Sequence, residues 1–448
     1  MKAPSQNPIQ VLPELEKHIL LDGFRIVLDL QKSWGCHLVD AVSGREFIDL
    51  YGFFGSLPVG FNHPWFDQPE VKADLLRAAR TKVANSDIYT AAYARFVRTF
   101  SRVVGLPPLE RYFFIDGGAL AVENALKAAM DWKVQKNLSA GKGEHGTEIM
   151  HFERAFHGRS GYTLSITNTD PVKTRYFAQF NWPRIQAPWI NFALPDPDRT
   201  QEVAQHEALA EAQILRCLRE RGDHIAAIIT EPIQGEGGDN HFRGEWLRTL
   251  RRICDEHDLL LIFDEVQTGM GLTGRNWCCE HFDVLPDLLV FGKKAQICGV
   301  MAGPRLDEVP DNVFRLPGRI NSTWGGNLTD MVRSRHCLRL METTHLVEQA
   351  AETGREFLEA LLAWQEETPS IRAVRGRGLM LAFDLPTPQA RERFYEGIYE
   401  QGLLALRSGE RSIRFRPPLD FPADNIPLVM DYLRRQCHAM EGTEFLSR

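Results

Sequence analysis

Three apolar runs in the sequence each lead into a charged residue. The run at 259–263 holds five apolar residues and ends at Asp264, and two similar runs end at Glu231 and Lys293. Unbroken apolar runs of this length are typical of strands that are buried on both faces in a parallel sheet. In such sheets, ligands bind at the carboxyl ends of the strands. We therefore expect the two carboxylates and the amine to lie along one edge of one sheet.

A lysine amine and a buried aspartate at one site suit one cofactor in particular. Pyridoxal 5'-phosphate forms a Schiff base with a lysine, and an acid beside its ring nitrogen keeps the ring electron-withdrawing. Asp264 and Lys293 are the candidates for these two roles, and the span between them can hold a helix and a strand. The residues alone thus suggest a pyridoxal-phosphate site in which Asp264 and Lys293 are catalytic.

The segments around these two residues resemble a known family. LIFDEVQTGMGLTG (261–274) and DLLVFGKKAQICG (287–299) are similar to the signature of the class III (subgroup II) aminotransferases. The resemblance implies an α/β protein of pyridoxal-phosphate fold type I, with a mostly parallel seven-stranded-type sheet in a large domain and a small α+β domain. The implied boundaries are 1–75 for the N-terminal part of the small domain, 76–335 for the large cofactor-binding domain and 336–448 for the C-terminal part of the small domain.

Lys293, and not Lys294, is expected to form the Schiff base. The family pattern has a small residue directly before this lysine, and Gly292 fills that place, whereas Lys294 follows another lysine. Cationic neighbours and a low dielectric should depress the pKa of Lys293. A neutral amine is a better nucleophile and can move protons at the substrate carbon.

The resemblance also implies how other residues hold the cofactor. Asp264 would pair with the ring nitrogen, and Phe156 and Val266 would pack on the two faces of the ring. Without the resemblance, Phe156 would be interpreted as a core residue and His157 as a satisfied loop histidine. The other cofactor-binding residues that the resemblance implies are His157, Gln267 at the phenolic oxygen, Gly118 and Ala119 at the phosphate, and Thr323 at the phosphate of the other subunit.

The phosphate site is expected at the start of a helix. A strand at 112–115, a glycine turn and a helix from about Ala119 would present free backbone N–H groups to an anion. A tight turn without a ligand is the alternative for this segment. Most family members carry Ser-Gly-Thr/Ser-Glu where this chain has Gly117-Gly118-Ala119-Leu120. The usual hydroxyl is missing, so more of the phosphate binding should fall on backbone N–H groups and on Thr323.

An aminotransferase must bind two substrates in turn, and the resemblance assigns residues to each. Arg414 matches the arginine that binds a dicarboxylate, 2-oxoglutarate, through a bidentate pair. Glu236 matches the acid that covers this arginine when the amino donor lacks such a carboxylate. Arg159 is the candidate for the other substrate carboxylate, and Asn321 is a further substrate-binding candidate. A surface or interface ion pair is the alternative for each arginine.

The choice of amino donor rests on resemblance to one branch of the family. The segments 116–124, 156–162, 291–299 and 321–330 look like those of L-lysine 6-aminotransferases. This implies a ping-pong transfer of the terminal amino group of L-lysine to 2-oxoglutarate, giving 2-aminoadipate 6-semialdehyde and L-glutamate. Ornithine and 4-aminobutyrate aminotransferases share the Arg–Glu switch and remain the alternative. The active site is expected at a homodimer interface.

Composition narrows the class of protein further. The 448 residues are 44% hydrophobic and 25% charged, as is typical of a soluble globular protein of two domains. The net charge of −7 argues against a nucleic-acid partner. We see no secretory signal, no apolar stretch of eighteen residues and no C-x-x-C pair, so a cytoplasmic protein without membrane spans is expected. His206-Glu207 does not extend to a zinc motif, and no metal site is expected.

One motif points to a different class of enzyme. Gly269–Gly274 matches G-x-G-x-x-G, which could mark an NAD-linked oxidoreductase. A dinucleotide fingerprint should follow its strand directly and open a helix, but the five residues Asp264 to Thr268 lie between the apolar run and this motif. A non-catalytic binding protein of the same fold, or an aminomutase or racemase, are the remaining alternatives.

Overall fold

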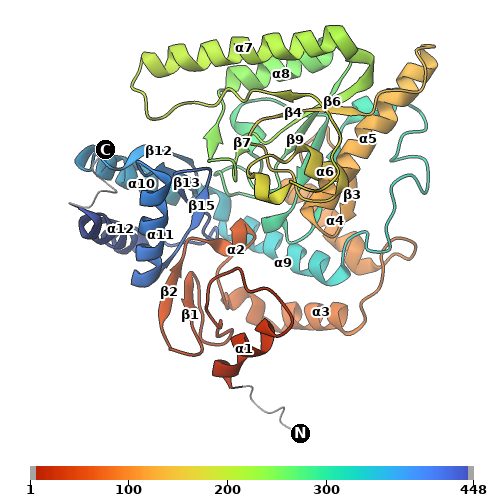
Figure 1. The fold of residues 1–448 in the computed structure, drawn as a ribbon. Coiled ribbons are helices and arrows are strands. Elements are labelled where there is room, and N and C mark those ends of the chain that lie inside the picture. Colours follow the sequence, from red (N-terminus) through yellow and green to blue (C-terminus); the bar gives the residue numbers. More distant parts are fainter. Residues whose placement is uncertain (1–6, 442–448) are drawn as a thin grey trace.

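The computed structural model describes residues 7–441. Residues 1–6 and 442–448, which belong to the predicted segments 1–75 and 336–448, lie outside the described residues. Its centre is a seven-stranded sheet in which β11 runs antiparallel to both of its neighbours and the other neighbouring strands run parallel. The predicted mostly parallel sheet is confirmed (Figure 1). In spatial order the strands are β3 (Arg111–Ile115), β11 (Cys298–Ala302), β10 (Leu288–Phe291), β9 (Leu260–Asp264), β6 (Ile225–Thr230), β4 (Glu148–Phe152) and β5 (Arg184–Ile185).

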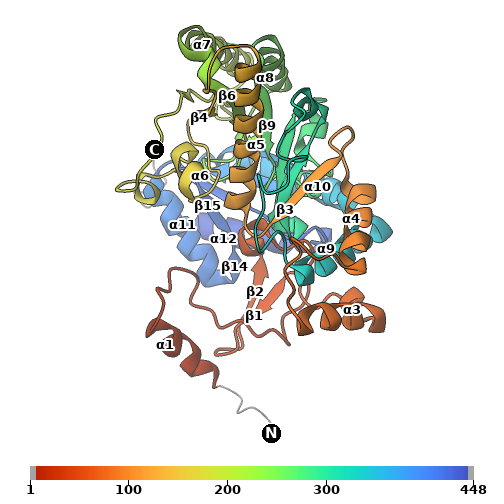
Figure 2. The ribbon, with the colours of Figure 1, turned by 90° about the vertical axis from the view of Figure 1, so that its right-hand side faces the viewer.

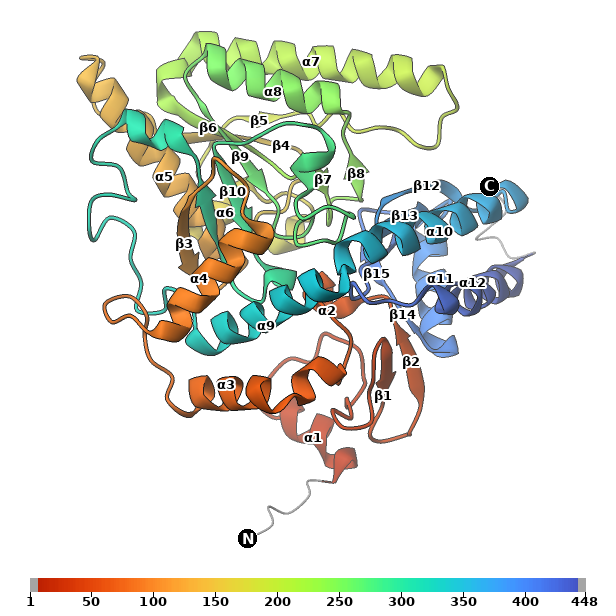
Figure 3. The ribbon, with the colours of Figure 1, turned by 180° about the vertical axis from the view of Figure 1, so that it is seen from behind.

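Helices cover both faces of this sheet. Helix α5 (Gly118–Ser139) packs along β6, β10 and β11 on one face, where it stands upright in Figure 2. Helix α8 (Gly244–Glu256) packs against β9 and β6 on the other face, and α7 (Asp198–Arg221) packs against β5. Helices α4 (Ala91–Val104) and α9 (Leu328–Thr344) pack on each other below them (Figure 3).

Side chains of β9 alternate between the two faces. Leu260 and Ile262 belong to the core under α5, whereas Leu261 and Phe263 belong to the core on the opposite face. Successive residues of a strand point to opposite sides, so Asp264 continues the α5 side and the residue after it the other side. Burial on both faces explains why the run is apolar without a break.

The small domain is built from both ends of the chain. Strands β1 (His37–Val39) and β2 (Glu46–Asp49) form a sheet with β14 (Leu403–Leu404), which pairs in parallel with β2. A four-stranded sheet is covered by three helices, and together they form the α+β unit that was predicted (Figure 1). These elements are β12 (Arg372–Arg377), β13 (Met380–Asp384), β16 (Ser412–Phe415), β15 (Leu406–Ser408), α10 (Leu346–Glu367), α11 (Pro388–Gln401) and α12 (Ile426–Met440).

No helix within residues 7–441 combines the length and the apolar content needed to cross a membrane.

Several further helices and strands belong to the described chain. The shorter elements are α1 (Val11–Glu16), α2 (Gly52–Gly55), α3 (Pro69–Arg80), α6 (Gly161–Ile166) and the paired strands β7 (Ile233–Gln234) and β8 (Asn240–His241).

The segment 24–28 forms no regular strand. The run 24–28 makes only an isolated bridge between Leu28 and Asp40. The carboxylate of Asp40 accepts the N–H of Val27 at 3.0 Å, and a side chain that takes a backbone donor in this way competes with a strand ladder. Phe24 packs its ring on Tyr399 instead, so the segment is held by side-chain contacts.

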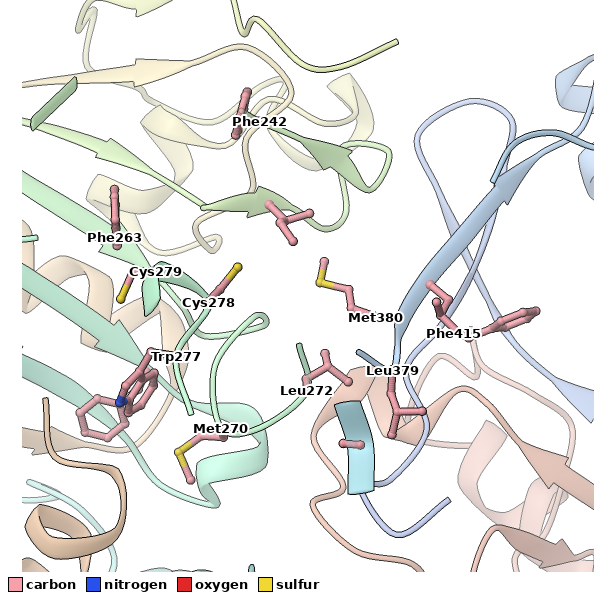
Figure 4. Packing of buried hydrophobic residues seen from close by; sticks show 14 of the residues in the cluster. Phe242, Phe263, Met270, Leu272, Trp277, Cys278, Cys279, Leu379, Met380 and Phe415 are labelled. Atoms are coloured by element: carbon pink, nitrogen blue, oxygen red, sulfur yellow. The ribbon is translucent and has the colours of Figure 1, made fainter. Parts of the chain in front are cut away.

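The Gly269–Gly274 motif packs between the two domains. Met270 and Leu272 are buried, and the Leu379 N–H donates to the Leu272 carbonyl at 2.9 Å (Figure 4). A methyl group on Gly378 would lie 2.6 Å from the Gly274 nitrogen, so the small domain approaches the loop at backbone distance. The segment forms turns and opens no helix. This loop therefore lacks the geometry of a dinucleotide site.

Candidate active site

The three charged residues predicted at one sheet edge do lie on neighbouring strands. β6, β9 and β10 are adjacent in the sheet, and Val290 lies opposite Asp264 in the register. Asp264 ends β9, Glu231 follows β6 and Lys293 follows β10 by two residues. The carboxyl ends of these strands thus bring an amine and two carboxylates together, as predicted.

Lys293 has the depressed pKa that was predicted. Loss of hydration, together with the positive charges of Arg414 and Arg416, lowers its pKa to about 7, against the opposing effect of Glu231 and Asp264. The Lys293 amine has no hydrogen-bond partner within residues 7–441. Its backbone φ is 50°, a left-handed value that residues other than glycine rarely adopt. Such strain is common at functional sites.

Lys294 is committed to a structural role. Its Nζ donates to the Leu57 carbonyl at 2.7 Å and to the Pro417 carbonyl at 2.8 Å. The side chain is buried, and it joins a segment from each end of the chain. This geometry agrees with the choice of Lys293 as the reactive amine.

The amine of Lys293 should be unusually reactive at neutral pH. In the cofactor-free protein, labelling of Lys293 by an amine-selective reagent should be half-maximal near pH 7, because only the neutral amine reacts and its fraction rises as pH rises through the pKa. An ordinary lysine reaches that point near pH ~10.4. Mass spectrometry of the Lys293 peptide across a pH series measures this midpoint. A midpoint near that of ordinary lysines would contradict the prediction.

Asp264 is held in one orientation by two donors. The His157 ring lies 2.7 Å from Asp264 through its Nδ1 and Oδ2 atoms, and the Val266 N–H donates to Oδ1 at 3.1 Å. Both Asp264 and His157 are buried. The other ring nitrogen of His157 is also buried and has no partner among the described residues. An ionised carboxylate accepts hydrogen bonds only, so His157 donates its Nδ1–H to it.

The start of α5 and the end of β10 form a narrow cradle around Val266. A methyl group on Gly118 would lie 3.3 Å from Val266 Cγ1, and one on Gly292 would lie at the same distance from that atom. Both glycines therefore approach Val266 where a larger side chain would not fit, and Gly292 directly precedes Lys293. The first N–H groups of α5 have no carbonyl one turn earlier in the helix and are free for an anion. These residues fit pyridoxal phosphate.

Gln267 lies between two arginines. Its Oε1 accepts hydrogen bonds from Arg414 Nη1 and from Arg416 Nε, each at 3.0 Å. Guanidinium groups only donate, so the amide oxygen must face them and the Nε2 donor must point the other way. Arg416 is fully buried and also pairs with Asp239. Arg416 was missed from the sequence, although it follows Arg414 by two positions and such residues share one face of a strand.

The predicted pair of Glu236 with Arg414 is not formed in the structure. Glu236 forms an ion pair with Lys173, at the end of the short 3-10 helix Pro171–Lys173. Arg414 is 5% exposed, and its Nε has no hydrogen-bond partner within residues 7–441. Lys173 was also missed, because no periodic pattern connects this loop lysine to a glutamate in a distant hairpin.

The remaining candidates lie nearer the surface. Phe156 is partly buried, and the Arg159 guanidinium lies 6.0 Å from its ring centre. Asn321 and Thr323 are exposed in a turn that is fixed to β3, because the Asn327 N–H donates to Asp116 at 3.0 Å. This contact places the turn beside the start of α5 without bringing Thr323 into the cluster around Lys293.

The fold and the site together define a pyridoxal-phosphate-dependent transferase of fold type I. The family model described as aminotransferase class-III matches residues 22–436. The chain belongs to this family, whose cofactor is pyridoxal 5'-phosphate.

Individual relatives are similar over nearly the whole chain. The L-lysine-epsilon aminotransferase of Mycobacterium tuberculosis is 49% identical over 431 residues, covering 96% of this chain and 95% of its own. The L-lysine-epsilon aminotransferase of Streptomyces clavuligerus is 47% identical over 426 residues, covering 94% and 92%. The solved structure of the lysine aminotransferase from M. tuberculosis superposes with a TM-score of 0.95 at 47% identity, covering 97% of this chain and all of that chain.

Proposed function

We propose that this protein transfers the terminal amino group of L-lysine to 2-oxoglutarate by a ping-pong mechanism, giving 2-aminoadipate 6-semialdehyde and L-glutamate. The observation that carries the proposal is the placement of the Lys293 amine and the Asp264 carboxylate at the ends of adjacent strands. The choice of lysine as donor is supported by identities of 47–49% to L-lysine-epsilon aminotransferases.

The bound cofactor supplies an electron sink for the carbon that carries the amine. Lys293 Nζ, of which about half is neutral at pH 7, would take a proton from C6 of the bound lysine and would deliver one on the cofactor side. Asp264 would stabilise the positive charge at the ring nitrogen, and its contacts with His157 and the Val266 N–H would keep the carboxylate oriented toward the ring. The same groups would act in reverse order when 2-oxoglutarate is the acceptor.

The other cofactor contacts follow from the cradle. Val266 and Phe156 would cover the two faces of the ring. The free Nε2 donor of Gln267 would reach the phenolic oxygen, since its Oε1 is taken by two arginines. The phosphate would bind the N–H groups of Gly118 and Ala119 at the start of α5, with Thr323 of a second subunit.

Substrate selection would rest on charged groups around this pocket. Arg414, buried and with a free Nε in the described chain, would bind the distal carboxylate of 2-oxoglutarate. Glu236 would neutralise Arg414 while lysine is bound, since C6 of lysine carries no carboxylate. Arg159 would take the α-carboxylate of lysine, and Asn321 would contact the substrate from the exposed turn.

We also propose a cytoplasmic homodimer whose active sites are shared. The exposed turn with Thr323, flanked by the exposed apolar side chains of Leu120 and Trp324, supports a subunit contact there. In the proposed domain organisation, residues 76–335 form the large domain, and residues 1–75 and 336–448 form the small domain.

The absorbance spectrum of the purified, cofactor-loaded protein tests the function. L-lysine alone, without an oxo acid, should remove the visible band of the bound cofactor, and 2-oxoglutarate should restore it. A band that ignores lysine but responds to ornithine or 4-aminobutyrate would change the donor and keep the class. A protein that forms no band with added cofactor would disprove the role of Lys293.

A further inference from the structure

Lys173 lies among the charged groups that are proposed to select the substrate. Its Nζ contacts Glu236 in an ion pair and lies 5.7 Å from the ring centre of Phe156, which also carries the Arg159 guanidinium at 6.0 Å. A hydrogen bond to Thr169 Oγ1 at 3.2 Å fixes the lysine side chain further. Lys173 therefore lies close to Phe156 and Glu236, and none of the roles proposed above includes it.

Glu236 pairs with Lys173, and Arg414 is a second cation near the same turn. A methyl group on Gly235, the residue before Glu236, would lie 2.3 Å from Gln267 Oε1, to which Arg414 donates. The positive charges of Arg159 and Arg414 contribute to lowering the pKa of Lys173, after loss of hydration and against Asp170, so Arg414 is electrostatically close to Lys173. Arg414 meanwhile donates to Gln267 and keeps a buried, unpartnered Nε within residues 7–441. The Glu236 carboxylate thus pairs with Lys173, and Arg414 remains available to bind a substrate carboxylate.

The ion pair has room to rearrange. Lys173 and Glu236 both line a cleft of about 810 Å³ between the large domain and the α11 side of the small domain. Their side chains are 19% and 23% exposed, whereas Arg414 is 5% exposed. The partly exposed glutamate therefore has space to rotate at the cleft wall, whereas the arginine is fixed by burial and by its bond to Gln267.

We propose that Lys173 is a positioning residue that holds Glu236 away from Arg414 and so keeps the dicarboxylate site open. In the open state Glu236 pairs with Lys173, and in the closed state it pairs with Arg414. This inference rests on the proposed function, because it assigns the open state to the 2-oxoglutarate half-reaction and the closed state to the lysine half-reaction. Three other arginines line the cleft, but each already pairs with a glutamate there, namely Arg154 with Glu410 and both Arg391 and Arg407 with Glu392. Without Lys173, Glu236 therefore turns to Arg414, whose Nε has no hydrogen-bond partner within residues 7–441. The closed state then gains population, and the apparent affinity for 2-oxoglutarate falls in proportion to the loss of the open state.

The test is the variant Lys173→Met, with each half-reaction followed by the absorbance of the bound cofactor. We expect the KM for 2-oxoglutarate to rise about tenfold with the aminated enzyme, while kcat/KM for L-lysine stays unchanged or increases. Lys173→Arg should restore the wild-type KM, because it keeps a cation for Glu236. Lys142→Met, which removes a lysine from the exposed pair with Asp223, is the matched control and should change neither half-reaction.

A double variant separates this role from direct substrate binding. In Lys173→Met with Glu236→Gln, no carboxylate remains to close on Arg414, so the KM for 2-oxoglutarate should return to that of Glu236→Gln alone. An unchanged KM in Lys173→Met, or a rise that persists in the double variant, would overturn the proposal. Failure of the wild-type protein to respond to L-lysine and 2-oxoglutarate would instead overturn the proposed function.

Discussion

Replacing Lys293 by alanine is expected to lower the rate of lysine transamination by about 10⁴-fold, because the variant lacks both the amine that binds the cofactor and the base that moves protons at C6. The fold should persist, since Lys293 makes no hydrogen bond through its amine in the described part of the chain. Single-turnover rates with L-lysine, measured on protein saturated with added cofactor, test the loss. Circular dichroism checks that the variant is folded.

The neighbouring lysine provides the matched control. Lys294→Ala removes the donor of two buried carbonyl groups, those of Leu57 and Pro417, and should cost about 2 kcal/mol of stability. Its lysine half-reaction should remain within a fewfold of the wild type at a temperature where the protein is folded. Loss of the half-reaction in Lys294→Ala together with its survival in Lys293→Ala would reverse the assignment of the two lysines.

The second large effect is expected at Asp264. An asparagine there keeps the shape but removes the charge beside the ring nitrogen, so the lysine half-reaction should slow by about 10²–10³-fold. The charge is effective because Asp264 is only 4% exposed and water does not screen it. Stopped-flow measurement of the first half-reaction gives the rate, and cofactor titration of the same variant should show weaker binding.

Glu265 is the control for this variant. It faces the opposite side of the sheet, where its carboxylate accepts the N–H groups of Cys278 at 2.6 Å and Cys279 at 2.8 Å. Burial raises the pKa of Glu265 to about 7, which is typical of a carboxyl group held inside a core. Glu265→Gln should lower the thermal midpoint and leave the lysine half-reaction within about twofold. Equal losses in both variants would contradict a specific electrostatic role of Asp264.

The strands that carry the site were predictable because they are buried on both faces. The runs ending at Glu231, Asp264 and Lys293 contain enough consecutive apolar residues to be recognised without knowledge of their neighbours. The gathering of these three residues along one edge was predicted from the rule that ligands bind at the carboxyl ends of parallel strands. The short strand β11 was not predicted, because its five residues include a glycine and follow a turn rather than a helix.

The contacts between side chains from distant loops could not be predicted. Glu236 and Lys173 lie in a hairpin and a one-turn helix, and neither segment has a hydrophobic period that would fix its orientation. The resemblance indicated Arg414 as the partner of Glu236, but the choice between two nearby cations depends on geometry that only the folded chain defines. Asp239, the partner of Arg416, was missed for the same reason.

The pairing of β2 with β14 has a consequence for synthesis of the chain. Ile48 of β2 pairs with Leu403 of β14, so about 350 further residues must be translated after β2 before this sheet of the small domain is complete. At the ~5–20 residues per second of a ribosome, the N-terminal strands wait roughly 20–70 s with an open edge. The large domain, which lies between them in the sequence, can fold during that delay. A nascent chain that terminates before residue 403 therefore leaves an exposed strand edge as its characteristic defect.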